Sequence, residues 1–110
     1  MESMSEEDYP LPPASFEFLV ASLRAQAEIQ LGLMHFGPEN ERPQPNLPLA
    51  RHAIDMLALI EEKTRGNLTM EEQRELGNSL TELRFRFVQI AETVAKAKPA
   101  GNEQTSEPAQ

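Results

Sequence analysis

Five polar side chains in the middle of the chain could together bind or act on a small molecule. Arg51 and Asp55 are one helical turn apart, which places a guanidinium next to a carboxylate. A catalytic carboxylate needs such a charged neighbour, or burial, to tune its pKa. Both residues fall on the polar face of an amphipathic segment, where a surface ion pair or a bridge to another subunit is the more frequent role. The candidate polar site is Arg51, Asp55, Lys63, Asn67 and Arg84.

The two histidines, His35 and His52, do not indicate metal chemistry. They flank one expected loop and could approach each other across it. A zinc site needs three or four convergent ligands, whereas the sequence has no Glu-x-x-His or His-x-x-x-His spacing and no cysteine. Solvated or capping histidines are therefore the favoured interpretation. We predict no metal site, no cofactor and no catalytic residue, and the balance is against an enzyme.

The segment from Lys63 to Glu72 has the residues of a tight corner between two helices. Gly66 suits the left-handed position that closes a helix, and Lys63 suits the negative end of the helix dipole. Thr69 can cap the next helix, and Glu72 three residues later completes a capping box. The same backbone could present N–H groups to an anion, but Glu72 and its neighbour place negative charge there. We favour a structural corner made by Gly66, Thr69 and Glu72, with anion binding as the alternative.

The charge balance excludes several classes of partner. The chain carries 18 Asp and Glu against 10 Lys and Arg, a net charge of −8. Proteins that bind nucleic acids or anionic membranes need clustered Lys and Arg, and the basic-aromatic run from Arg84 to Arg86 is too short to supply them. No apolar run approaches the ~20 residues that span a bilayer, and the acidic N-terminus lacks the features of a signal peptide. We expect a cytoplasmic protein without nucleic-acid or membrane partners.

Helices must position these residues. Residues 1–13 and 98–110 are polar and have little to bury, so we expect a disordered acidic head and a disordered tail around a domain at 14–97. The segment 37–46 contains three prolines and cannot continue a helix. Apolar periodicity without β-like alternation predicts an all-α, three-helix domain whose last two helices form an antiparallel hairpin. The expected helices span about 15–36, 47–65 and 70–97.

The first helix has two apolar stripes on nearly opposite sides. A three-helix monomer can cover one stripe but not easily both. An exposed second stripe would form an apolar patch on the order of a few hundred Å², which monomers usually avoid. Its small residues would allow close approach of a second copy in a two-fold contact. We expect an interface at this second stripe, which contains Phe18, Ala21, Ala25, Ile29, Gly32 and Phe36.

The third helix has a coiled-coil-like seam whose large apolar residues are spaced 4-3-4-3-4. These residues are Leu76, Leu80, Leu83, Phe87, Ile90 and Val94. Phe85 leaves the seam beside two arginines, a composition enriched at interfaces, although packing of Phe85 onto the first helix has equal weight. Gly77 costs roughly 1 kcal/mol relative to alanine inside a helix, so we expect close packing at that position. Phe85 joins the second stripe in the candidate interface.

Four stretches of the chain form a recognisable combination, namely LPLAR at 47–51, IDML at 54–57, EEKTRGNLTMEE at 61–72 and LTELRFRFV at 80–88. Together they resemble the small bacterial family catalogued as domain of unknown function 1844. The resemblance covers about residues 15–90, including a leading helix followed by a Leu-Gly pair. Its most specific part is the Lys-Thr-x-Gly-Asn-Leu-Thr corner, in combination with the Ile-Asp-x-Leu segment before it. The resemblance implies a small bacterial helical protein and supplies no activity, substrate or cofactor.

Two functional hypotheses remain. The leading one is a non-enzymatic, self-associating helical protein, a homodimer that acts as an adaptor or regulatory subunit. The apolar face of the first helix could instead receive a different protein. The alternative is a small-molecule or anion-binding domain, possibly catalytic, near the corner between the second and third helices. That alternative requires the five residues of the polar site to converge.

Overall fold

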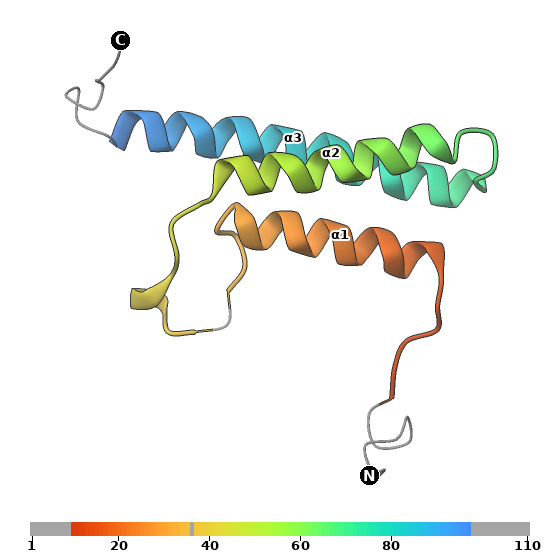
Figure 1. The fold of residues 1–110 in the computed structure, drawn as a ribbon, viewed down its shortest axis with the longest axis horizontal. Helices are drawn as coiled ribbons and strands as arrows, with labels where there is room; N and C mark the ends of the chain where they lie inside the picture. The colour runs from red at the N-terminus through yellow and green to blue at the C-terminus, as the bar shows by residue number, and fades with distance from the viewer. Residues whose placement is uncertain (1–9, 36, 98–110) are drawn as a thin grey trace.

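The computed structural model describes residues 10–35 and 37–97, and the regular structure within them is helical. Three α-helices, α1 (Phe16–Gln30), α2 (Leu47–Lys63) and α3 (Met70–Ala97), follow one another, with a 3₁₀ turn, η1 (Glu39–Glu41), before α2 (Figure 1). The all-α prediction is confirmed. The predictions made for residues 1–9, Phe36 and 98–110 lie outside the described residues. Within the described ranges no helix combines the length and apolar character needed to cross a membrane.

The three helices pack side by side along their lengths. α2 and α3 form the predicted antiparallel hairpin, and α1 lies beside them, antiparallel to α2 (Figure 1). The end of α1 is fixed to the start of α2, since the Asn46 N–H donates to the Gln30 carbonyl at 2.7 Å. α3 has 28 residues and α2 has 17, so the C-terminal turns of α3 extend past the start of α2.

α1 ends at Gln30, about six residues before the predicted end. Gly32 has a φ of +82°, the left-handed conformation that closes a helix. The Leu33 N–H donates to the Glu28 carbonyl at 2.9 Å and the Gly32 N–H donates to the Ile29 carbonyl at 3.0 Å, which together form a Schellman motif. The predicted extension of this helix to 36 is therefore wrong, because Gly32 terminates the helix instead of contributing to its face.

The corner between α2 and α3 is built from local hydrogen bonds. Gly66 adopts a φ of +86°. The Thr69 hydroxyl accepts from the Glu72 N–H at 3.0 Å, while the Glu72 carboxylate accepts from the Thr69 N–H at 2.9 Å. This reciprocal pair is a capping box. α2 ends at Lys63, two residues before the expected end, because the chain already turns at Thr64.

The core lies where the three helices meet. Each helix contributes one apolar stripe, and along α3 the seam residues are buried at Leu76, Leu80 and Leu83 and half-buried further on. Small residues of α1 and α2 let the helices approach closely at the centre. The buried hydrophobic residues are Val20, Ala27, Leu31, Ala50, Ala53, Ile54, Leu57, Leu76, Leu80 and Leu83. Ten buried hydrophobic residues in the described part of the chain make a small core, so each of them carries a large share of the stability.

Gly77 is not closely packed, contrary to the expectation from the sequence. A Cβ placed on this residue would meet no atom within 4 Å. The glycine therefore weakens α3 without allowing any approach within the chain. We expect Gly77→Ala to raise the free energy of unfolding by about 0.5–1 kcal/mol, measured by urea denaturation at fixed protein concentration. A destabilised variant would show that another chain approaches the backbone at this position.

Candidate functional site

The structure brings together three of the five residues of the predicted polar site. Arg51 and Asp55 of α2 and Arg84 of α3 line one hollow between the two helices. Its apolar lining consists of Ile54, Phe87 and Val88. Lys63, at the end of α2, and Asn67, in the corner, do not line this hollow. Arg84 enters it because α3 returns antiparallel to α2.

The hollow can hold a small anion or a carboxylate, but it lacks the features of a catalytic centre. Arg51, Asp55 and Arg84 are all exposed. Among the described residues no ion pair within 4.0 Å joins Arg51 to Asp55. Two arginines that share a hollow with apolar side chains provide forked donors for a carboxylate. Exposed side chains without fixed partners are not preorganised for chemistry.

A second hollow lies at the corner between α2 and α3. It is lined by Glu61, Arg65, Gly66, Leu68 and Gln73, so that carboxylate and guanidinium groups share one opening. Glu72, whose carboxylate accepts from Thr69, already occupies the helix N-terminus where an anion would sit. The capping side chains therefore accept hydrogen bonds from backbone N–H groups at this corner without a ligand.

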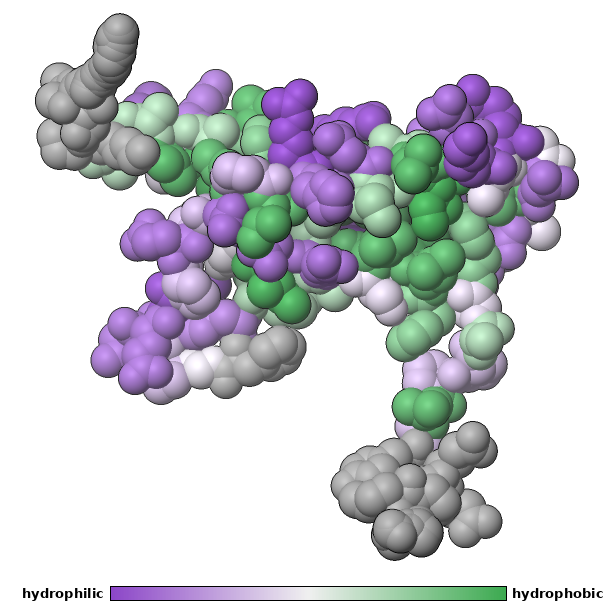
Figure 2. All heavy atoms as spheres, viewed as in Figure 1, coloured by the Kyte–Doolittle hydropathy of each residue, from purple (hydrophilic) through white to green (hydrophobic). Residues whose placement is uncertain are grey.

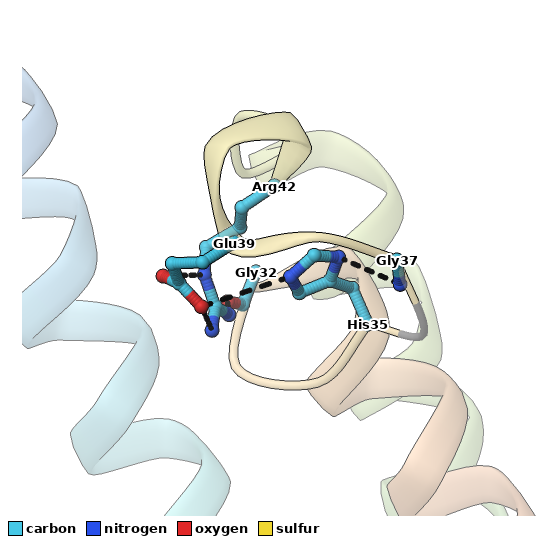
Figure 3. Close-up of polar contacts among 5 residues, drawn as sticks. All are labelled: Gly32, His35, Gly37, Glu39 and Arg42. Carbon is cyan, nitrogen blue, oxygen red and sulfur yellow. Dashed lines mark hydrogen bonds and ion pairs between the residues drawn. The ribbon is translucent and has the colours of Figure 1, made fainter.

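His35 belongs to a cluster of polar contacts in the loop after α1 (Figure 3). Its Nδ1 accepts from the Gly37 N–H at 3.3 Å, and its Nε2 lies 3.9 Å from Oε1 of Glu39. Arg42 forms a bidentate pair with Glu39 at 2.9 and 3.0 Å and also donates to the Gly32 carbonyl. The hydrogen bonds from Arg42 lower the pKa of Glu39. These contacts tie the loop to the end of α1.

No metal centre is formed in the parts of the chain that the structure describes. His52 is exposed on α2, whereas the His35 ring is 12% exposed and engaged in the loop cluster. Within residues 10–35 and 37–97 no group of three or more His, Cys, Asp or Glu side chains converges. His35 is therefore held by contacts within its own loop, and His52 faces solvent.

Sequence reasoning missed a polar contact that joins α1 to α3. Arg24 donates to Glu82 of α3 at 2.7 Å, to the hydroxyl of Ser79 at 3.3 Å and to Glu28 on its own helix at 3.0 Å. The bond to Glu28, followed by the interactions with Glu82, raises the pKa of Arg24. Ser79 is 1% exposed and is thus a buried polar residue of the core. The signal in the sequence was the narrow charged band of α1, flanked by apolar residues on both sides.

The candidate interface residues are divided between two helices. Phe18 and Ile29 on the outer face of α1 are 48% and 39% exposed, with exposed Ala21 and half-buried Ala25 between them. Phe85 is 62% exposed on α3, so packing of its ring onto α1 is excluded.

Gly32 does not belong to the face formed by these α1 residues. It lies in the turn after α1, and a Cβ there would be 3.6 Å from the Pro45 ring. Its assignment to the helical stripe is thus corrected. Phe36 lies outside the described residues.

A family model described as Domain of unknown function (DUF1844) matches residues 13–89, which include α1, α2 and most of α3. The chain belongs to this family. The resemblance found in the sequence is thereby confirmed, and the family description names no activity, ligand or partner. The last turns of α3 lie beyond the matched residues. No curated protein and no solved structure matches the chain significantly.

Proposed function

We propose that this protein is a non-enzymatic, self-associating helical protein, a homodimer that serves as an adaptor or regulatory subunit in a bacterial cytoplasm. The observation that carries the proposal is the exposed apolar surface of α1. The Phe18 and Ile29 side chains are 48% and 39% exposed, on a helix whose opposite face packs in the core. Soluble monomers rarely leave contiguous apolar surface of this kind uncovered.

The residues between Phe18 and Ile29 favour a close helix contact. Ala21 is exposed and Ala25 is half-buried, so the surface between the two larger side chains is shallow. A shallow apolar helix face accepts an identical face by two-fold symmetry, in which each residue is used by both copies. Two-fold homodimers are the commonest symmetric assemblies, which makes a second copy the simplest partner.

We expect the wild-type chain to scatter light as a dimer at micromolar concentration. Phe18→Glu and Ile29→Glu should each shift it toward the monomer, because a carboxylate in an apolar contact loses its hydration without gaining a partner. Gln89→Glu, an exposed change on α3, serves as the matched control. A wild-type monomer that stays folded and soluble over the same concentrations would contradict the proposal. Capture of a different protein by such a monomer would assign the surface to that partner instead.

A second candidate function is the binding of a small carboxylate in the hollow between α2 and α3. The presence of Arg51 and Arg84 in one hollow beside apolar side chains favours it. A bound tricarboxylate such as citrate should raise the melting temperature of the wild type in proportion to the logarithm of its concentration. The same titration should have no effect on the double variant R51A/R84A. Equal shifts in both proteins would show that the hollow is not the binding site.

A further inference from the structure

The seam between α1 and α3 carries charges along its length. The two helices run parallel (Figure 1), and Arg24 in the middle of α1 donates to Ser79 and Glu82 of α3. Residues three, four or seven positions from Arg24 or from Ser79 lie on the same edges of the two helices. The charged residues at those positions are Glu17, Glu28, Glu72, Glu75, Glu82 and Arg86.

The carboxylates in the middle of the seam already have partners in the same chain. Arg24 pairs with Glu28 at 3.0 Å and with Glu82 at 2.7 Å. The Glu72 carboxylate accepts from the backbone at the start of α3. These three carboxylates are therefore occupied before any second molecule approaches.

The two ends of the seam carry exposed charges of opposite sign. Glu17 and Glu75 lie toward the corner, and Arg86 lies toward the C-terminal turns of α3. Among the described residues no ion pair within 4.0 Å involves any of the three. One end of the seam is therefore acidic and the other is basic.

The same polarity extends over the whole of α3. Its first half, residues 70–83, contains four glutamates and one arginine, a net charge of −3. Its second half, residues 84–97, contains one glutamate and three Lys or Arg, a net charge of +2. Figure 2 shows hydrophilic side chains gathered around the corner between α2 and α3, which lies at the acidic end.

Glu17 and Arg86 lie at equal distances from the middle of the seam. Glu17 is seven residues before Arg24, and Arg86 is seven residues after Ser79, so each lies about 10 Å away along its helix. The two side chains are roughly 20 Å apart along the seam and cannot pair within one copy. A pair between them requires two chains.

The outer face of α1 is arranged about the same midpoint. Phe18 lies six residues before Arg24 and Ile29 five residues after it, and both are exposed. A two-fold axis beside Arg24 and perpendicular to α1 sets Phe18 of one copy against Ile29 of the other. The same axis sets the acidic end of each seam against the basic end of the other. In a parallel contact like charges would meet at both ends, which is unfavourable.

We propose that a second copy of this chain seats antiparallel on the outer face of α1, with Glu17 and Glu75 of each copy facing Arg86 of the other. The inference rests on the proposed self-association and gives it a direction. Two-fold symmetry forms the charged contact twice, once at each end of the interface. Charges at the rim of an interface contribute to register and specificity more than to affinity. The apolar contact of Phe18 with Ile29 therefore holds the copies together, and the charges orient them.

Charge reversal and its rescue test this orientation. Arg86→Glu should raise the dissociation constant of the dimer at least about fivefold, because it turns two attractions into repulsions. Adding Glu17→Arg should return the dissociation constant to within about threefold of the wild type, which reports a contact between copies. Arg74→Glu, the same charge change at an exposed residue of α3 at the acidic end, should raise it less than about twofold. Sedimentation at one ionic strength measures these constants.

The outcomes separate this inference from the proposed function. A wild type that is monomeric at every concentration contradicts the self-association itself. A dimer that Phe18→Glu dissociates and Arg86→Glu leaves unchanged contradicts the antiparallel orientation alone. Equal weakening by Arg74→Glu and Arg86→Glu would be an effect of net charge and would also overturn the orientation. A double variant that stays as weak as Arg86→Glu would show that Glu17 does not face this position.

A cross-linking measurement locates the contact directly. Arg86→Lys keeps the charge and supplies an amine, which a carbodiimide joins only to a carboxylate in contact with it. In a mixture of isotope-labelled and unlabelled copies, mass spectrometry should find position 86 joined to Glu17 or Glu75 of the other copy. A link only to Glu28 of the same copy would show that position 86 turns back into its own chain. That result, or no link at position 86 in a dimer, contradicts the inference.

Discussion

Replacing Leu57 by alanine is expected to lower the free energy of unfolding by about 2–5 kcal/mol. Leu57 is 0% exposed near the centre of α2 and belongs to the buried cluster to which all three helices contribute. The change removes apolar contacts and leaves a cavity that rigid helices fill incompletely. Because domains of this size are stable by only ~5–15 kcal/mol, the variant should lose a large part of its stability.

Urea denaturation followed by circular dichroism measures this effect at one fixed protein concentration, since the proposed dimerisation would make the apparent stability depend on concentration. Leu11→Ala is the matched control, because the same atoms are removed from a side chain that is 74% exposed. It should change stability by less than about 0.5 kcal/mol. Equal losses in the two variants would mean that Leu57 does not lie in the core.

The hairpin of α2 and α3 could be predicted because its signals are local. Asn46 accepts from the Leu49 N–H as a helix cap, and Thr69 and Glu72 satisfy each other within four residues. Such contacts depend on neighbours in the sequence and survive any tertiary arrangement. The seam on α3 was equally predictable, since its 4-3 spacing places the apolar residues on one face of the helix whatever packs against it.

The end of α1 was missed because apolar periodicity continues past the residue that terminates the helix. Gly32 and Phe36 continue the second stripe by spacing alone, but the left-handed Gly32 ends the helix. A glycine followed by a proline-rich loop was the signal for that break. The prediction of close packing at Gly77 failed for the opposite reason. The absence of a side chain shows that approach is possible, and only the tertiary structure shows whether anything approaches.

The candidate polar site was predictable only in part. The spacing of Arg51 and Asp55 places both on one face of α2, whereas the position of Arg84 depends on the register between α2 and α3. Register between helices is set by core packing and cannot be read from one segment. Lys63 and Asn67 were grouped with the others through closeness in sequence, and the turn at the end of α2 separates them from the hollow.

The contact between Arg24 and Ser79 could not be predicted from local sequence patterns, because the two residues are 55 positions apart. It also has a specific energetic consequence. Ser79 is nearly inaccessible to water, so its hydroxyl depends on partners within the protein. A buried polar group that loses its partner costs more than the hydrogen bond contributed.

Arg24→Met is therefore expected to lower the free energy of unfolding by about 1–3 kcal/mol, since it keeps the apolar stem and removes the donors to Ser79 and Glu82. The ionic part is small because Arg24 is 30% and Glu82 49% exposed, where solvent screens the charges. Adding Ser79→Ala should recover part of the loss, because both partners of the buried hydrogen bond are then absent. Glu82→Gln should cost less than Arg24→Met. Denaturation of Arg24→Met, of Ser79→Ala and of their double variant at one concentration gives the coupling, and strictly additive losses would show that Ser79 does not depend on Arg24.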